Sequence, residues 1–306
     1  MRLGYGGALI GLCLFATASA QSASPDVTGC QSELVPSQRI EYCTRAIQSG
    51  LYSGAEAAGV YRNRASAYLI EQDYDQAIAD YDKAIRLKPD HPAALVDRGQ
   101  AYAGKRQYDR AVADYDAAIH LKPDYPEAFN DRGNARVNQG HLEQGIADYD
   151  AALKLRPDYA EALINRGTAY SDLGQLDRAL ADYDAAIRLK PGEASAFNDR
   201  CWTLIKLKRF DAALADCNTG LSLSPNKLSI LDSRGFAYLG AGDTRRALAD
   251  FNQALATDPR IPTSLFGRSA AERLLGNSSA ADRDAAAALA IWPGVETYLR
   301  KQAVLP

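Results

Sequence analysis

The sequence of 306 residues is poor in the side chains that most often carry chemistry. It has three histidines, five cysteines and one methionine, which leaves few ligands for a metal cluster. Basic charge is not in excess either, since 35 Lys and Arg stand against 38 Asp and Glu, whereas nucleic-acid-binding proteins carry basic stripes. We therefore expect no metal, no cofactor and no nucleic-acid partner. The 47% of hydrophobic and 24% of charged residues are typical of a folded globular protein.

Long hydrophobic runs are absent outside the first twenty residues. Arg2 precedes a charge-free apolar stretch from Gly4 to Thr17, and Ala18-Ser19-Ala20 has the pattern of a signal-peptide cleavage site. No other stretch lacks charges over the roughly 18 residues that a transmembrane helix needs. The sequence predicts a signal peptide over residues 1–20, with an uncleaved anchor as the alternative. We expect a periplasmic or secreted protein that is not an integral membrane protein after cleavage at Ala20.

Catalytic motifs are also missing. The sequence contains no Walker A loop, no G-x-S-x-G, no H-E-x-x-H and no G-x-G-x-x-G. Paired aspartates such as Asp80/Asp82 and Asp114/Asp116 resemble acid–base dyads, but they recur at a fixed spacing. Residues two apart also point to different sides of a helix. We interpret these pairs as structural and expect neither catalytic residues nor an enzymatic activity.

The sequence is organised by a period of 34 residues, which three columns of seven identical residues share. The columns are Pro89, Pro123, Pro157, Pro191, Pro225, Pro259 and Pro293; Arg64, Arg98, Arg132, Arg166, Arg200, Arg234 and Arg268; and Asp80, Asp114, Asp148, Asp182, Asp216, Asp250 and Asp284. Each period has the pattern of two amphipathic helices. In the second, Leu95, Gly99 and Tyr102 mark a first helical face, Tyr115 lies on a second one, and Pro123 ends the second helix.

These positions resemble the tetratricopeptide repeat (TPR) family, in which a small residue and Tyr on the first helix are followed by Ala, an aromatic residue, Ala and Pro. The matching residues of the fourth unit are Gly167, Tyr170, Ala179, Tyr183, Ala186 and Pro191. Because no single hairpin can bury its apolar face alone, neighbouring units have to stack. The sequence therefore predicts an all-α fold, a right-handed solenoid of helical hairpins with terminal capping helices.

The predicted domain organisation follows the period. An N-terminal leader and capping helix occupy residues 21–57, and residues 296–306 form a C-terminal capping helix. The seven repeat units lie between them, at residues 58–91, 92–125, 126–159, 160–193, 194–227, 228–261 and 262–295. We expect residues 21–29, which are small and polar, to be a mobile leader.

The matched Arg and Asp columns lie 16 residues apart, with Arg on the first helix and Asp on the second. We interpret them as a repeated ion pair that ties a hairpin, or adjoining hairpins, together. The alternative is an arginine stripe that binds anions. The equal number of aspartates favours the ion pair.

Four cysteines remain once the signal peptide has removed Cys13, and an oxidising compartment favours disulfides between them. Of the three possible pairings we predict Cys30–Cys43 and Cys201–Cys217. Most units have a small residue after the Arg and an aromatic one after the Asp, as in Gly99/Tyr115, and the fifth unit changes both to Cys. Two independent buried thiols are the alternative.

The resemblance implies that the first helices line a concave groove that binds the partner. One first-helix column is polar in the early units and becomes Trp202 and Phe236 later, and Phe266 comes from a neighbouring column. The predicted partner-binding groove consists of Trp202, Phe236, Phe266, Ile205, Leu239, Asn198, Asp199, Asp232, Asn130 and Asn134. Its acidic rim favours a segment with basic and apolar residues. The alternatives bury these rings against the next repeat, the C-terminal helix or a homodimer partner.

Three functions are compatible with this pattern. The leading hypothesis is an exported, non-catalytic scaffold or adaptor that binds a peptide segment or a partner protein in its groove. The second is an accessory subunit that positions a separate cell-envelope enzyme, and the third and most remote is a catalyst. The sequence leaves the partner and the oligomeric state open.

Overall fold

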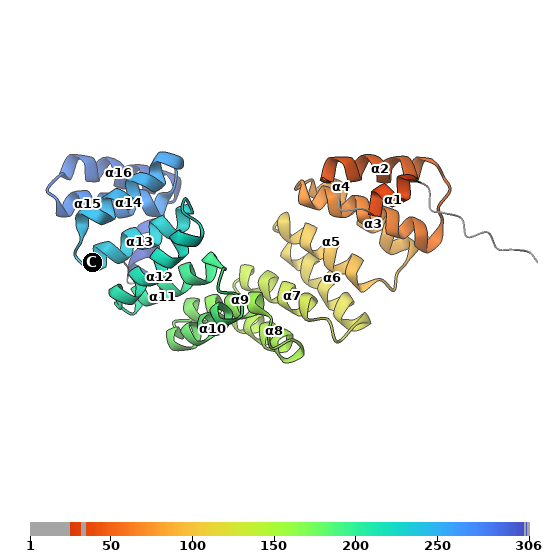
Figure 1. The fold of residues 1–306 in the computed structure, drawn as a ribbon, viewed down its shortest axis with the longest axis horizontal. Coiled ribbons are helices and arrows are strands. Elements are labelled where there is room, and N and C mark those ends of the chain that lie inside the picture. Colours follow the sequence, from red (N-terminus) through yellow and green to blue (C-terminus); the bar gives the residue numbers. More distant parts are fainter. Residues whose placement is uncertain (1–24, 32–34, 303, 305–306) are drawn as a thin grey trace, which may run out of the picture. The chain divides into compact units, whose positions relative to one another are not determined.

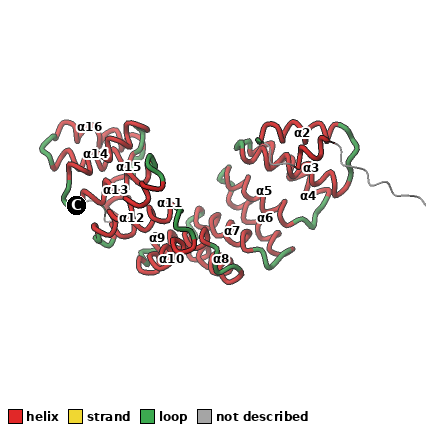
Figure 2. The backbone as a smooth tube through the Cα atoms, viewed as in Figure 1, coloured by secondary structure: helices red, strands yellow, loops and turns green. Residues whose placement is uncertain are grey.

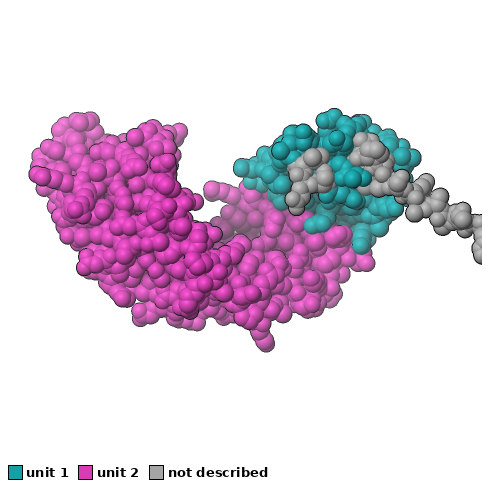
Figure 3. Space-filling model, viewed as in Figure 1, with its two compact units in different colours: residues 1–89 teal, residues 90–306 magenta. Residues whose placement is uncertain are grey.

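The computed structural model describes residues 25–31, 35–302 and 304, so the predicted signal peptide lies outside the described residues. In these ranges the protein consists of 17 α-helices without a strand, and the predicted all-α fold of consecutive helical hairpins is confirmed (Figures 1 and 2). None of the described helices is long and apolar enough to cross a membrane. The chain divides into two compact units, residues 1–89 and residues 90–306 (Figure 3).

The first unit contains α1 (Pro25–Gln31), α2 (Pro36–Gln48), α3 (Gly54–Ile70) and α4 (Tyr74–Leu87). Its small core brings Cys30, Cys43, Ala46 and Val60 together. Cys30 and Cys43 form a disulfide with an S–S distance of 2.07 Å, which joins α1 to α2 as predicted. Residues 25–29 of the expected leader are part of the helix α1, which the disulfide joins to α2.

The second unit continues the hairpins with 13 helices. They are α5 (Pro92–Gly104), α6 (Tyr108–Leu121), α7 (Pro126–Asn138), α8 (Leu142–Leu155), α9 (Ala160–Asp172), α10 (Leu176–Leu189), α11 (Ala194–Lys206), α12 (Phe210–Leu223), α13 (Leu228–Gly240), α14 (Thr244–Thr257), α15 (Pro262–Leu274), α16 (Ser278–Ile291) and α17 (Val295–Lys301). Odd-numbered helices from α5 to α15 are the first helices of the repeats, and even-numbered helices are the second ones.

The recurrent residues set the ends of the helices. Every second helix from α4 to α16 has 14 residues and ends two positions before a proline of the 34-residue period, as α6 does at Leu121 before Pro123. The residue before a proline is disfavoured in the helical region, so the helix stops there. Within the hairpin α9–α10, Gly174 has a φ of 77°, which glycine adopts without strain.

Ion pairs repeat along the hairpins as the Arg and Asp columns predict. In the hairpin α11–α12, Nε and Nη2 of Arg200 donate to both carboxylate oxygens of Asp216 at 2.7 and 2.6 Å. Its Nη1 donates to Asp184 of the preceding hairpin at 2.6 Å. All seven Arg residues of the column make the contact within their own hairpin. One guanidinium can therefore hold a hairpin closed and join it to its neighbour.

Small and aromatic residues meet across each hairpin. A Cβ atom at Gly99 would lie 2.6 Å from the ring of Tyr115, and one at Gly235 would lie 2.6 Å from Phe251, so these rings need glycine opposite them. In the fifth unit the same two positions hold the Cys201–Cys217 disulfide, with an S–S distance of 2.19 Å. The pairing predicted from the repeat is the one that the structure contains.

Candidate functional site

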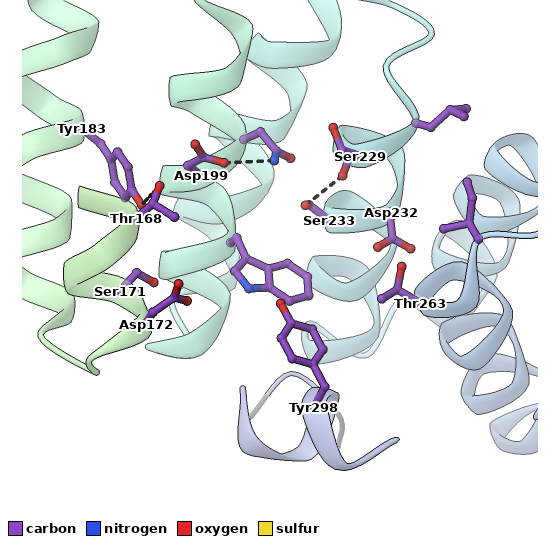
Figure 4. Close-up of a pocket in the computed structure, with 14 residues that line it drawn as sticks. Thr168, Ser171, Asp172, Tyr183, Asp199, Ser229, Asp232, Ser233, Thr263 and Tyr298 are labelled. Atoms are coloured by element: carbon purple, nitrogen blue, oxygen red, sulfur yellow. Dashed lines mark hydrogen bonds between the residues drawn. The ribbon is translucent and has the colours of Figure 1, made fainter. Parts of the chain in front are cut away.

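A pocket of about 600 Å³ lies on the first-helix face of the second unit. Residues of α9, α11, α13 and α15 form its walls, and Tyr298 of the C-terminal helix α17 closes one side (Figure 4). The lining residues are Thr168, Ser171, Asp172, Tyr183, Asn198, Asp199, Trp202, Leu228, Ser229, Asp232, Ser233, Ile261, Thr263 and Tyr298. The predicted groove residues Trp202, Asn198, Asp199 and Asp232 thus lie together around one cavity.

Three carboxylates from three successive first helices surround this pocket. Burial raises the pKa of Asp199 to about 6, although the amide of Asn198 donates a hydrogen bond to it at 3.4 Å. Burial likewise raises the pKa of Asp232 to about 6, with the hydroxyls of Ser264 and Thr263 as donors. Burial also raises the pKa of Asp172. Burial is the common cause of the raised pKa values, since it disfavours the charged form of a carboxylate.

Cationic side chains act on two of these three carboxylates, since Lys206 and Lys301 influence Asp172 and Lys227 influences Asp199. Lys206 and Lys301 act on Asp172 and lower its pKa, against the larger effect of burial. The ammonium of Lys206 is itself engaged, because it donates to the carbonyl oxygen of Ser171 at 2.6 Å and to its hydroxyl at 3.0 Å. Asp232 differs from the other two carboxylates, because no cation among the described residues contributes to its pKa.

The prediction that Phe236, Ile205 and Leu239 line the partner-binding groove is wrong. Phe236 and Ile205 are completely buried and Leu239 is 4% exposed, so a partner cannot reach them. They belong to one apolar cluster that also contains Val295, Leu299 and Val304 of the C-terminal segment. The ring of Phe236 approaches α15 of the next repeat, where a Cβ atom at Gly267 would lie 3.0 Å from it. Burial in the core, which the sequence left open as an alternative, is what the structure shows for these residues.

Trp202 and Phe266 differ from these core residues because both are only partly buried. Trp202 packs edge-on against Phe236 with 5.6 Å between ring centroids, and its exposed part lines the pocket. Phe266 lines a smaller pocket of about 300 Å³ with Arg273 and Arg300 instead. The structure therefore does not bring Phe266 to the same site as Trp202.

The two early groove residues are occupied by contacts within the protein. Asn130 is fully buried, donates to Asp131 at 3.2 Å and accepts from Asn165 at 3.0 Å. Asn134 accepts a hydrogen bond from the hydroxyl of Tyr149 at 2.6 Å. The prediction that Asn130 faces the partner is wrong, because its amide completes a polar network between α7 and α9.

Residues that occupy the position of Trp202 in other units contact the second helix of their own hairpin. The tyrosine hydroxyl of the second helix meets Ser66 in the first unit and Thr168 in the fourth, at 3.1 and 3.3 Å. In the sixth unit both partners are apolar, since Phe236 packs on Phe251 with 5.1 Å between ring centroids. This paired change from polar to apolar is visible in the sequence and could have indicated that Phe236 is core.

Sequence reasoning missed Asp172, Ser171 and Tyr298. Asp172 and Ser171 lie at the end of α9, outside the columns that were compared, and Tyr298 follows the last period. Among the described residues, no group of His, Cys, Asp and Glu is arranged to hold a metal ion. What the pocket does offer is carboxylates, neutral hydrogen-bond donors and three aromatic side chains, Tyr183, Trp202 and Tyr298.

Stacked helical hairpins with a pocket on the face of their first helices define an α-helical repeat protein. A tetratricopeptide repeat model matches residues 130–194, 165–227 and 234–296, and a second one matches residues 64–124. The first model alone matches more than half of the chain, and the protein belongs to the tetratricopeptide repeat family. Members of this family are protein-interaction scaffolds, so a protein or a peptide is the expected kind of partner.

Solved structures with the same fold differ widely in sequence. The APC/C hetero-tetramer Cut9–Hcn1 matches with a TM-score of 0.69 and 14% identity over 90% of this chain, which spans 55% of that one. A TPR protein from Parabacteroides merdae ATCC 43184 matches at 0.65 and 18% identity, over 81% of this chain and 98% of that one.

PilW, a type IV pilus biogenesis factor, matches with a TM-score of 0.63 and 22% identity over 68% of this chain and 97% of that one. At these identities the likeness concerns the fold alone. A comparison with curated proteins gives no significant match.

Proposed function

We propose that the protein is an exported, non-catalytic scaffold that binds a segment of a partner protein on the first-helix face of residues 90–306. The observation that carries this proposal is the pocket between α9, α11, α13 and α17, where Trp202 remains partly exposed among buried carboxylates. Partly exposed tryptophan in a pocket is typical of binding sites, because one large ring supplies much of the contact area.

The chemistry of the pocket favours a segment that mixes apolar and basic residues. Trp202, Leu228 and Ile261 supply an apolar surface, while Asp199 and Asp232 supply negative charge. A neutral or acidic segment would leave the two carboxylates without an opposite charge and would remove water from them. Basic side chains on the partner provide that charge, and apolar neighbours pack on the indole.

The cysteines support export. Both disulfides are buried, and disulfides persist in oxidising compartments and are rare in the cytosol. The signal-peptide pattern at residues 1–20 is an independent feature of the sequence that leads to the same compartment. We therefore place the proposed scaffold in the periplasm or outside the cell.

A displayed library of random peptides tests whether this face binds a segment. We expect selected peptides to bind the purified protein and to lose at least ten-fold in affinity on Trp202→Ser, which removes an aromatic anchor worth more than about 1.4 kcal/mol. Leu155→Ser is the control, because Leu155 is 43% exposed at the end of α8 and lies outside the pocket. Peptides that bind both variants equally, or no selected peptide at all, would contradict the proposed site.

A further inference from the structure

We infer that the pocket between α9, α11, α13 and α17 receives one basic side chain, Lys or Arg, from the bound segment, in contact with Asp199, Asp232 and Trp202. This inference rests on the proposed function, which it makes specific. The group that enters the pocket is then a positively charged ammonium or guanidinium group.

The aspartates of this protein differ in the charge of the groups that donate hydrogen bonds to them. Each Asp of the 34-residue column accepts hydrogen bonds from a guanidinium, as Asp216 does from Arg200 at 2.6 and 2.7 Å. The donors to Asp199 and Asp232 in the described structure are an amide and hydroxyls, which carry no charge. Buried carboxylates are normally paired with a cation, whereas buried Asp232 and partly buried Asp199 accept hydrogen bonds only from neutral groups.

A hydrogen-bond acceptor beside Asp199, the side-chain oxygen of Asn198, is unused within the described structure. The Oδ1 atom of Asn198 is buried and accepts no hydrogen bond from the residues that the structure describes. Asn198 lines the same pocket and donates its own amide hydrogen to Asp199. A buried carbonyl oxygen without a donor costs free energy. An ammonium or guanidinium group that enters beside Asp199 can donate to this oxygen as well as to the carboxylate.

The volume and the aromatic lining of the cavity also suit a basic side chain. About 600 Å³ is ample for a Lys or Arg side chain together with part of its backbone. Trp202 and Tyr298 both contribute to the lining, and Figure 4 shows Tyr298 reaching from α17 toward the space that Asp172 and Asp232 flank. Cations are attracted to the faces of indole and phenol rings. The C-terminal helix therefore takes part in the site.

The two ends of the pocket are not equivalent. Lys206 and Lys301 act on Asp172, so that end already experiences positive charge. Asp232 is buried on α13, and no cation contributes to its pKa. Lys227 makes the smallest contribution to the pKa of Asp199, so an incoming cation meets the least opposing charge at Asp232.

Two tripeptides that differ only in charge test the inference directly. Acetyl-Leu-Arg-Leu-amide carries a guanidinium, and its citrulline analogue has nearly the same shape without the charge. Trp202 serves as the fluorescent reporter in a Trp292→Phe background, because the protein contains only these two tryptophans. We expect a saturable change in Trp202 fluorescence with the Arg peptide at pH 7.5 and at least ten-fold weaker binding of the citrulline peptide. The Lys peptide acetyl-Leu-Lys-Leu-amide then shows which basic group fits better.

Charge-removing variants supply the second measurement. Asp199→Asn and Asp232→Asn should each weaken binding of the Arg peptide at least ten-fold and leave the citrulline peptide unaffected. Asp158→Asn is the matched control, since Asp158 is exposed in the turn before α9 and lies outside the pocket. Binding of the Arg peptide should also weaken below pH 6, where Asp199 and Asp232 take up protons.

Equal binding of the Arg and citrulline peptides overturns the inference, and this comparison requires no variant to fold. So does unchanged affinity in folded Asp199→Asn and Asp232→Asn proteins. If displayed peptides bind through Trp202 but contain no basic residue, the proposed function stands and the inference fails. If neither the displayed peptides nor the tripeptides bind, both fail.

Discussion

Two buried aspartates of the hairpin α13–α14 show how differently one residue type is used. Asp250 accepts hydrogen bonds from Nε and Nη2 of Arg234 at 2.8 and 2.7 Å. Asp232 is almost as buried, but its donors are the hydroxyls of Ser264 and Thr263. Burial consequently raises the pKa of Asp232 to about 6, which means that the folded state resists its ionisation.

We predict opposite effects for the same substitution at these two positions. The native pKa of Asp232 is higher than the unfolded one, so its contribution to stability is present at low pH and is lost as the pH rises through about 6. Asp232→Asn should therefore raise the melting temperature at pH 7.5, by a gain of about 2 kcal/mol, and change it little at pH 4. Asp250→Asn should lower it at pH 7.5, because breaking a buried ion pair costs about 3 kcal/mol.

Differential scanning calorimetry at pH 4 and pH 7.5 measures both effects. An equal loss of stability from the two substitutions at pH 7.5 would mean that Asp232 acts as a structural hydrogen-bond acceptor rather than as a strained charge. The comparison also exposes a trade-off, since the variant that stabilises the protein removes a carboxylate from the proposed site.

At the residue scale, the sequence predicted the contacts of residues that recur in every unit and missed the residues that occur only once. The Arg and Asp columns identify their partners because seven copies keep the same spacing, and the change of two positions to Cys201 and Cys217 identified a contact. Phe236 was misjudged because its column was compared only with itself, without its partner Phe251. Tyr298 and Asp172 occur outside any column, so no internal comparison could assign them to the pocket.

At the scale of the helical hairpin, each repeat depends mainly on its neighbours. The disulfide Cys201–Cys217 joins α11 to α12, where other hairpins have a glycine against an aromatic ring. It closes a loop of about 17 residues, for which the loop-entropy model gives about 3 kcal/mol. Its effect should be concentrated on the hairpin that also supplies Asp199 and Trp202 to the pocket.

We predict that removing this disulfide loosens the protein locally. In Cys201→Ala/Cys217→Ala, amide hydrogen exchange should accelerate in α11 and α12 and in the adjoining α10 and α13, and much less in α5 to α8. Cys30→Ala/Cys43→Ala is the matched control and should accelerate exchange in α1 and α2 instead. Uniform acceleration along the whole chain in either variant would contradict a repeat array whose contacts are mostly between neighbours.

Helix boundaries were the most predictable part of the structure and the position of α17 was the least. Pro123 and its equivalents end the second helices by a local steric effect that needs no tertiary context. The C-terminal helix has only seven residues, and its apolar residues Val295 and Leu299 could have packed on any free apolar surface. It contacts α15 and α16 and shares an apolar cluster with Phe236 and Ile205, and no local sequence pattern fixes that position.

At the scale of the whole molecule, the pocket differs from the rest of the repeat array in how its aspartates are neutralised. The chain has a net charge of −3, and most buried aspartates are neutralised by the arginine column. Asp232 is buried and Asp199 partly buried without such a partner, in a family whose members act as interaction scaffolds. The first-helix face therefore combines a general scaffold with carboxylates that no arginine in the described structure neutralises.

Export and folding are coupled through the cysteines, which gives the last prediction. When the full sequence is produced in a bacterium with an oxidising periplasm, we expect mass spectrometry to find a mature N-terminus at Gln21. We also expect iodoacetamide to label none of its four cysteines unless a reductant is added first. The same chain produced without residues 1–20 in a reducing cytosol should carry free thiols and melt at a lower temperature, which oxidation should restore. A protein that retains Met1, or that is alkylated without reduction, would argue against export, because the Cys30–Cys43 and Cys201–Cys217 disulfides would then have no compartment that maintains them.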